Sequence, residues 1–244
     1  MNKTRIAWTE KTWNPITGCS KVSSGCKNCY AENMAMRLHA MGIKKYINKF
    51  NVTLHESALY EPFSCKTASL IFVCSMADIF HDEVPFSFID RIFEVIKVTP
   101  NNTYQILTKR PLRMVEYFKD KQIPKNVWVG VTVETASELY RIDYLRNLSC
   151  SVRFISAEPL LGDLGKIDLT NINWMLVAGE SGSNGRPMKE EWVLSLFEQC
   201  KIQKVGFFFK QWGMWGPDGI RRTKKENGNL LQGKIVHQMP ILTV

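Results

Sequence analysis

Three cysteines near the start of the chain are the residues best suited to chemistry. Cys19, Cys26 and Cys29 lie in the segment GCSKVSSGCKNCY, with six residues in the first arm and two in the second. Three thiolates on one short loop form a metal centre with an open coordination position, which separates a reactive metal from a structural one. Gly18 and Gly25 allow such a loop to fold tightly. We therefore predict that the three cysteines bind a metal centre.

Zinc is the main alternative occupant of this loop, because zinc ribbons also use the Cys-x-x-Cys spacing. A structural zinc takes four ligands, usually as two pairs, and the sequence has no second Cys-x-x-Cys and no His-x3-His pair. His39, on the helix expected after the loop, is a candidate for a fourth zinc ligand. We predict that each of the remaining cysteines is a small buried apolar residue. They are Cys65, Cys74, Cys150 and Cys200.

Length and composition favour one globular α/β domain. The chain has 244 residues, 45% of them hydrophobic and 23% charged, which supplies ample material for a core. Segments of helical and strand character alternate throughout, as in parallel α/β folds. We expect one α/β domain over residues 1–212. A Gly-rich, basic extension or lid at 213–244 is expected to pack on the same domain.

Charge and hydropathy bear on location and partners. The sequence has no apolar run of about 18 residues and no apolar signal core at its start, so we expect a cytoplasmic protein without a membrane partner. Thiols stay reduced in that compartment, where clustered cysteines bind metal more often than they form disulfides. The net charge of +9 suits either a polyanionic partner such as nucleic acid or a basic surface for anionic small molecules.

Short apolar runs alternate with helical patterns, as expected of a sheet that helices cover. The predicted strands are residues 6–13, 69–75, 103–108, 127–133, 151–156, 174–178 and 206–210. The predicted helices are residues 29–41, 86–98, 111–119, 135–148 and 190–200. The segment 43–64 is polar and irregular, which predicts an excursion from the main fold.

Polar and charged residues follow six of the predicted strands. They are SMAD at 75–78, TKR at 108–110, TVE at 132–134, SAEP at 156–159, GES at 179–181 and KQW at 210–212. Ligands of parallel α/β folds bind at the carboxyl ends of the strands, so six such clusters predict one shared site. The alternative for the clusters is that polar residues simply begin the loops there, and the alternative for an individual charged residue is an internal ion pair.

Together these motifs resemble the radical S-adenosylmethionine (SAM) superfamily, in which three cysteines after the first strand bind a [4Fe-4S] cluster. The chain looks closer still to a short, phage-associated branch of that superfamily, which is distantly similar to spore photoproduct lyase, a DNA repair enzyme. The resemblance spans residues 6–212. It rests on WT at 8–9, TWNP at 12–15, GC at 18–19, CxxCYA at 26–31, SMAD at 75–78, LTKRP at 107–111, SAEPL at 156–160, GES at 179–181 and KQWG at 210–213. One departure is the first arm of the cysteine motif, which has six residues where the superfamily usually has three.

The resemblance implies a partial (β/α)6 TIM-like barrel with mostly parallel strands and an N-terminal cluster-binding loop. It also implies two cofactors, a [4Fe-4S] cluster and SAM, in an enzyme that cleaves SAM reductively to start radical chemistry. The cluster ligands would be Cys19, Cys26 and Cys29. The candidates for SAM contacts are Ser75, Asp78, Thr108, Lys109, Arg110, Thr132, Glu134, Glu158 and Glu180. Among them, Asp78 would bind the ammonium group of SAM, and Lys109 or Arg110 its carboxylate.

The ends of the first and last strands supply further candidates. The candidates for a substrate wall are Trp13, Asn14, Gln211 and Trp212. Aromatic side chains at such positions either stack on a base or close the barrel, and both interpretations stay open. Lys210 and Glu158 are the candidates for catalytic residues.

Several functions fit these motifs. A radical SAM enzyme needs an external electron donor such as flavodoxin or ferredoxin, and the substrate here would be a nucleic-acid base or a small metabolite. The altered cysteine spacing leaves open cleavage of another C–S bond of SAM, with transfer of a 3-amino-3-carboxypropyl group. Charge and resemblance together also allow a base-modifying or repair role on DNA. A hypothesis from a different class of function is that the chain is a zinc-stabilised nucleic-acid-binding protein without catalysis.

Overall fold

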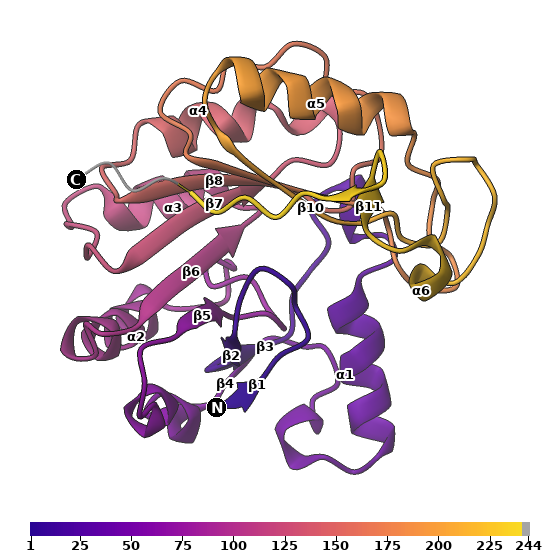
Figure 1. Cartoon of the computed structure of the whole chain (residues 1–244). Helices are drawn as coiled ribbons and strands as arrows, with labels where there is room; N and C mark the ends of the chain where they lie inside the picture. Colours follow the sequence, from indigo (N-terminus) through magenta and orange to yellow (C-terminus); the bar gives the residue numbers. More distant parts are fainter. Residues whose placement is uncertain (241–244) are drawn as a thin grey trace. The chain divides into compact units, whose positions relative to one another are not determined.

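The computed structural model describes residues 1–240, in which strands alternate with helices along the chain (Figure 1). Eight strands form one sheet in the order β1-β2-β5-β6-β7-β8-β9-β10. They are β1 (Asn2–Lys3), β2 (Lys11–Trp13), β5 (Leu70–Val73), β6 (Thr103–Thr108), β7 (Val127–Thr132), β8 (Val152–Ala157), β9 (Trp174–Ala178) and β10 (Gly206–Gln211). β1 pairs antiparallel with β2, whereas β2, β5 and β6 pair in parallel, as do β8, β9 and β10. This order and direction confirm the predicted α/β class, a partial TIM-like barrel with mostly parallel strands.

Helices and short strand pairs make up the rest of the fold. The α-helices are α1 (Tyr30–Ala40), α2 (Phe86–Val98), α3 (Pro111–Phe118), α4 (Tyr140–Arg146), α5 (Glu190–Ile202) and α6 (Lys224–Asn227). The short antiparallel pairs are β3 (Ile16–Thr17) with β4 (Thr53–Leu54), and β11 (Leu230–Leu231) with β12 (Lys234–Ile235). In residues 1–240, no helix combines the length and the apolar character that a bilayer crossing requires.

The chain divides into two compact units, and the cysteine loop contributes to both. The first unit comprises Met1–Val22, Cys29–Val129 and Leu148–Ser151, and the second comprises Ser23–Asn28, Gly130–Asn147 and the chain from Val152 onward. Cys19 and Cys29 therefore belong to the first unit, whereas Cys26 belongs to the second.

The core of the first unit includes most of β5 and aromatic side chains of α2 and α3. Three of the four residues of β5 are buried, as predicted for a strand of a sheet that helices cover. α2 and α3 pack through aromatic side chains, with the ring centroids of Phe93 and Tyr117 5.5 Å apart. α2 has the predicted bounds, because the residue after its C-cap Thr99 is a proline, which cannot continue a helix.

The second unit packs α5 against β10 through the rings of Phe197 and Phe207, whose centroids are 5.1 Å apart. Figure 1 shows α4 and α5 on the same side of strands β8–β10. Farther along the chain, the amide of Phe209 donates to the carbonyl of Val236 at 2.8 Å, so part of the basic extension runs beside β10. The proposed domain limit at residue 212 stays a prediction.

Three predicted elements are clearly shorter than their sequence patterns indicate, including the strand expected at 69–75, of which β5 keeps Leu70–Val73. The strand expected at 6–13 is reduced to β2, because the amide of Thr9 donates to the carbonyl of Ile6 and its hydroxyl to the carbonyl of Leu70. This turn buries Trp8 against Phe72 instead of extending the strand. The helix expected at 135–148 is divided. Its first turn is a 3-10 helix, Ala136–Glu138, closed by a capping box, and α4 follows.

The isolated cysteines differ in burial. Cys74 and Cys200 are buried, as predicted. Cys65 and Cys150 are only partly buried, so the prediction is wrong for these two. The sulfur of Cys65 accepts a hydrogen bond from Lys11 Nζ at 3.3 Å, which accounts for its place near the surface.

Candidate metal and cofactor site

The backbone around Gly18 sets the position of Cys19 in the first unit. The amide of Gly18 donates to the carbonyl of Met76 at 3.0 Å, and the amide of Cys19 donates to the carbonyl of Phe50 at 3.1 Å. Gly18 has a φ of +87°, and a Cβ atom there would overlap the carbonyl group of Asn51. Only glycine fits such a close approach to the backbone of Asn51. Any side chain at this position would force open the turn that precedes Cys19.

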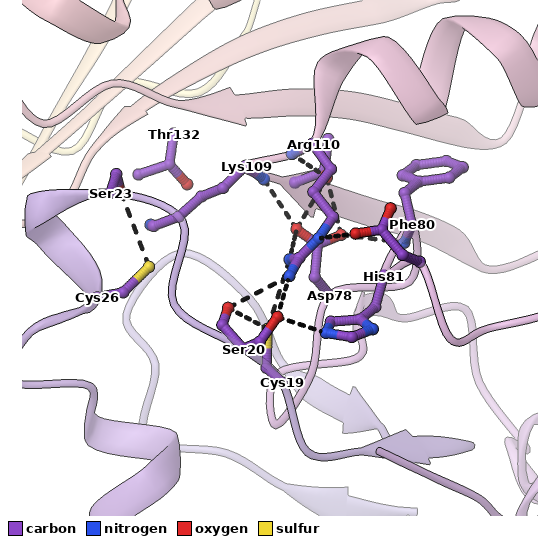
Figure 2. Close-up of polar contacts among 12 residues, drawn as sticks. Cys19, Ser20, Ser23, Cys26, Asp78, Phe80, His81, Lys109, Arg110 and Thr132 are labelled. Carbon is purple, nitrogen blue, oxygen red and sulfur yellow. Dashed lines mark hydrogen bonds and ion pairs between the residues drawn. The ribbon is translucent and has the colours of Figure 1, made fainter. Parts of the chain in front are cut away.

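Arg110 directs its guanidinium group at the start of the cysteine loop (Figure 2). Its Nη1 atom lies 3.5 Å from the sulfur of Cys19 and 3.4 Å from Oδ2 of Asp78. Its Nη2 atom donates to the hydroxyl of Ser20 at 2.9 Å and to the Ser20 carbonyl at 3.2 Å, and Nε lies 3.9 Å from Asp82. Burial acts to lower the pKa of Arg110, but Asp78 and Cys19 outweigh it and raise that pKa. The fixed positive charge favours a thiolate at Cys19.

The carboxylate of Asp78 joins the turn after β5 to the end of β6. It accepts the Thr108 hydroxyl at 2.7 and 2.9 Å, the amide of Lys109 at 2.9 Å and the amide of Phe80 at 3.0 Å. Together with Arg110, these donors cover both oxygens of a buried side chain. Asp78, Thr108 and Arg110, which the sequence placed in one site, are therefore in contact. The binding of an ammonium group by Asp78 stays a prediction.

His81 and Ser20 extend this cluster, and the sequence did not single out either residue. Nδ1 of His81 accepts the amide of Glu83 at 3.1 Å, so the neutral ring carries its proton on Nε2. Nε2 lies 2.7 Å from the hydroxyl oxygen of Ser20 and donates to it. Burial, and next the charge of Arg110, lower the pKa of His81. A neutral imidazole and a guanidinium thus hold the residue that follows Cys19.

The third cysteine lies at the start of α1. Cys29 is the N-cap residue of this helix, and its side chain makes no capping hydrogen bond. The hydroxyl of the next residue, Tyr30, donates to the carbonyl of Ser75. Oδ1 of Asn14 in turn accepts the Ser75 hydroxyl and the Met76 amide, both at 3.1 Å. Asn14 and Ser75 therefore hold the turn after β5 that anchors the helix start. Their contacts with substrate and cofactor stay predictions.

Both predicted tryptophans are core residues of their own units. Trp13 is fully buried and donates its indole N–H to the carbonyl of Ala58 at 2.7 Å. Trp212 is buried in the second unit and donates to the carbonyl of Leu230 at 2.9 Å. Of the two interpretations left open by the sequence, this burial favours closure of the core. A substrate contact by either ring stays a prediction.

Cys26 lies in the second unit beside a buried ion pair. Its sulfur is 3.7 Å from the hydroxyl oxygen of Ser23, and this hydroxyl donates to Oε1 of Glu134 at 2.6 Å (Figure 2 shows the Ser23–Cys26 contact). Oε2 of Glu134 accepts from Arg141 of α4 at 3.0 Å. Arg141 also donates to the carbonyl of Thr132 at 2.8 Å, at the end of β7. Thr132 and Glu134, both predicted SAM contacts, thus meet at one buried arginine.

A second carboxylate of the same unit holds the other end of this segment. Glu180 follows β9 and receives a two-pronged ion pair from Arg186, with Nη2 2.6 Å from Oε1 and Nε 2.8 Å from Oε2. Asn28 donates to Oε2 of Glu180 at 3.0 Å and to the carbonyl of Asn184 at 2.8 Å. Burial opposes ionisation, but the hydrogen bonds from Arg186 and Asn28 lower the pKa of Glu180. The carboxylate is therefore charged and engaged with the cysteine loop.

An ion pair lies at the ends of β8 and β10, and some polar atoms of these segments have no hydrogen-bond partner among the described residues. Lys210 Nζ lies 2.5 Å from Oε2 of Glu158, the two candidates for catalytic residues. Within the described chain, Oε1 of Glu158, the hydroxyl of Ser156 and Oε1 of Gln211 are buried and have no hydrogen-bond partner. Gln211 donates its amide to the carbonyl of Gly179 at 3.1 Å, which leaves its oxygen to accept. Buried acceptors of this kind fit a ligand that carries hydroxyl or ammonium donors.

The donor set of the cysteine loop fits an iron–sulfur cluster in its chemistry. All seven cysteines, each within the described residues, are outside disulfide bonds, and the three loop cysteines are partly exposed. Burial raises the pKa of Cys74 far above its ordinary value and that of Cys200 to about 12, so these two remain thiols. Over residues 1–240, no group of three or more His, Cys, Asp or Glu side chains is gathered as a metal site. The fit to a cluster therefore rests on the chemical type of the donor atoms and on the position of the loop ahead of the first helix.

Several residues with a place in these clusters escaped the sequence analysis. They are Ser20, Ser23, Asn28, His81, Arg141 and Arg186. Ser20, Ser23, Asn28 and His81 have partners far away in sequence, 111 residues in the case of Ser23 and Glu134 and 152 in the case of Asn28 and Glu180. Arg141 and Arg186 instead pair with Glu134 and Glu180, seven and six residues away. Only Arg141 carries a local signal, because a charge flanked by the apolar side of a predicted helix needs an internal partner.

Comparisons with known proteins place the chain in a family without assigning its chemistry. A family model described as "Protein of unknown function (DUF5131)" matches residues 3–240. None of the curated proteins matches the chain. Among solved structures, it is similar to a mutant spore photoproduct lyase with bound AdoMet and dinucleoside spore photoproduct, at 11% identity and a TM-score of 0.48, over 72% of this chain and 57% of that one. A second structure, the lyase complexed with dinucleoside spore photoproduct, gives 11% identity and a TM-score of 0.45 over 76% and 59%. The chain thus spans less than two thirds of these proteins.

Proposed function

The chain belongs to the DUF5131 family of proteins of unknown function, and from its own residues we propose that it is a radical SAM enzyme. Cys19, Cys26 and Cys29 would bind a [4Fe-4S] cluster, whose open iron would bind SAM. The observation that carries the proposal is the cysteine loop itself, three partly exposed cysteines ahead of α1 in a parallel α/β fold. When bound, such a cluster supplies an electron to the sulfonium group of SAM.

The charges around the loop support a thiolate-bound metal centre. The guanidinium of Arg110 lies against the sulfur of Cys19, and Cys29 directly precedes the first turn of α1. A guanidinium beside a sulfur stabilises the anion, which is the metal-binding form. The remaining loop residues contribute position, since Ser20 and Ser23 attach the first arm to His81 and Glu134.

The second unit supports the SAM part of the proposal. SAM carries an ammonium group and two ribose hydroxyls, and all three need acceptors when they leave water. Oε1 of Glu158 and Oε1 of Gln211 are buried acceptors without a partner in the described chain, and the Ser156 hydroxyl is equally unpartnered. Lys210 neutralises the other oxygen of Glu158, so a ligand donor would meet an ion pair with one oxygen still available.

The experiment is anaerobic reconstitution of the purified protein with iron and sulfide, followed by metal analysis. The product is then incubated with SAM and a chemical reductant in place of flavodoxin or ferredoxin. We expect a coloured protein that releases 5′-deoxyadenosine. Methylthioadenosine as the product would instead indicate transfer of a 3-amino-3-carboxypropyl group. A colourless protein with stoichiometric zinc would overturn the proposal and leave the zinc-stabilised nucleic-acid-binding protein in its place.

The substrate is proposed as a nucleic-acid base or a small metabolite. The net charge of +9 favours a polyanion, because basic surfaces attract phosphates through long-range electrostatics. Addition of DNA to the reconstituted protein tests this class directly. Stimulation of SAM cleavage, or a modified base in the recovered DNA, supports a nucleic-acid substrate. Equal turnover with and without DNA, together with no binding at low salt, excludes it.

A further inference from the structure

The middle of the cysteine loop is a part of the second unit. Residues Ser23–Asn28 belong to that unit, although the chain before and after them belongs to the first. Cys26 is therefore the one loop cysteine whose surroundings come from β7, β9 and the segments that follow them. What holds these six residues in place also sets the position of Cys26.

The first attachment is a chain of side chains from α4. The fully buried Arg141 pairs with Glu134, whose exposed fraction is 0%, and the other oxygen of Glu134 accepts the hydroxyl of Ser23. A Cβ atom on Gly25 would overlap the side chain of Glu134, so the loop backbone lies directly on this carboxylate. Ser23 gives its one proton to Glu134, so in the thiol form Cys26 is the donor in its contact with Ser23.

The second attachment is the ion pair of Glu180 and Arg186. Arg186 donates from Nη2 to the carbonyl of Ser24 at 3.0 Å, and Asn28 donates to Glu180 at 3.0 Å. The segment is thus fixed on both sides of Cys26, two residues before it and two after it. Charge-assisted hydrogen bonds to a buried carboxylate are among the stronger contacts available to a loop.

We propose that Glu134 and Glu180 are positioning residues that fix Cys26, each through an arginine on one side and the loop on the other. This inference rests on the proposed function, in which Cys26 is a metal ligand. It assigns the two carboxylates to the loop instead of to SAM. It also gives the long first arm a purpose, because Ser23, Ser24 and Gly25 lie in that arm and make three of the contacts.

The test measures each cysteine separately in the metal-free, reduced protein. Cleavage after Lys21 and Lys27 puts Cys19, Cys26 and Cys29 on three different tryptic peptides, so maleimide labelling rates are resolved by mass spectrometry. Asn28→Ala and Glu180→Gln each remove a charge-assisted hydrogen bond to the segment. We expect the labelling rate of Cys26 to rise on the order of tenfold, since exposure follows local opening of the segment. The rates of Cys19 and Cys29 stay unchanged.

Two further variants separate positioning from general loosening of the fold. Glu191→Gln makes the same chemical change on the exposed face of α5, where the side chain is 69% exposed, and leaves all three rates unchanged. Arg186→Lys keeps the charge but loses the two-pronged geometry, so its Cys26 rate lies between those of wild type and Glu180→Gln.

A wild-type rate at Cys26 in both Asn28→Ala and Glu180→Gln would overturn the inference, as would an equal rise at all three cysteines. After iron–sulfide reconstitution, we also expect less iron and an altered electron paramagnetic resonance spectrum in these two variants, with Glu191→Gln matching wild type. A wild-type protein that takes up no cluster would contradict the proposed function. The labelling rates would still decide whether the carboxylates position Cys26.

Discussion

Nη1 of Arg110 lies 3.5 Å from the sulfur of Cys19 and 3.4 Å from a carboxylate oxygen of Asp78. One buried guanidinium therefore faces two groups that are anionic when Cys19 is a thiolate. The Asp78 carboxylate holds Arg110 in place, and Arg110 in turn compensates the charge of a metal-binding sulfur. The relationship makes the end of β6 an electrostatic support for the first cysteine.

Arg110→Ala tests this support through stability. The change leaves Asp78 buried without its cation, so we expect the free energy of unfolding to fall by about 3 kcal/mol. Urea unfolding of the metal-free protein measures it. The matched control is Arg91→Ala, which removes an exposed ion pair with Glu56 and should lower the free energy of unfolding far less. Equal losses in the two variants would contradict a special role for the Arg110–Asp78 pair.

A second prediction concerns the turn before the first cysteine. Gly18→Ala places a methyl group against the carbonyl of Asn51 at a φ of +87°, so we expect a loss of about 2 kcal/mol or more in unfolding free energy. Gly42→Ala is the matched control, because Gly42 has a φ of +73° and open space around its Cβ position. Gly42→Ala should lower the free energy of unfolding by only about 1 kcal/mol, which is the cost of placing an alanine in the left-handed backbone region. Indistinguishable urea midpoints would show that the close approach is unimportant.

Most of the secondary structure was predictable because its signals are local. The strand 103–108 and the helix 86–98 have the predicted bounds, since apolar runs and Pro100 mark their limits. The prediction of a strand over 6–13 was wrong because the contact that shortens it is not local in sequence. The turn that shortens it depends on a hydrogen bond from Thr9 to Leu70, a residue 61 positions away that no pattern in the window contains.

The same distinction between local and long-range signals applies to the candidate site. The sequence placed Asp78, Thr108 and Arg110 in one cluster because each follows or ends a predicted strand, and the structure brings them into contact. It also singled out Glu134 and Glu180 from their positions after strands. Their partners in the cysteine loop lie more than 100 residues away, so only the folded chain identifies those contacts.

The pH dependence of stability forms a third prediction. Burial, and next the charge of Lys45, lower the pKa of His55 to about 4, and the pKa of His81 is lowered as well. Between the unfolded value of about 6.5 and these lower values, the unfolded chain binds more protons than the folded one. The stability that these two histidines contribute is therefore full above pH 6.5 and is lost as the pH drops below it.

For the half-buried His55 we expect a loss of about 1 kcal/mol between pH 7 and pH 5, after allowance for solvent screening. Urea midpoints at a series of pH values measure this slope. His55→Gln keeps a hydrogen-bonding group near Thr17 but cannot titrate, so the slope should become flatter. Glu180, whose pKa is lowered, contributes to acid sensitivity only below about pH 4.3, outside this window. An unchanged slope in His55→Gln would remove His55 as a cause.

The fourth prediction separates the loop cysteines from the other thiols. Cys19→Ser, Cys26→Ser and Cys29→Ser each remove one proposed ligand, and we expect each to lose most of the iron that wild type retains after anaerobic reconstitution, because a hydroxyl is a poor iron–sulfur ligand. Cys65→Ser is the matched control, since this cysteine is also partly exposed but lies outside the cysteine loop, where its sulfur accepts a hydrogen bond from Lys11. It should hold iron and sulfide in wild-type amounts. If any one of the three loop variants also keeps the wild-type iron content and absorption spectrum, that cysteine is not a ligand and the proposed three-cysteine site is wrong.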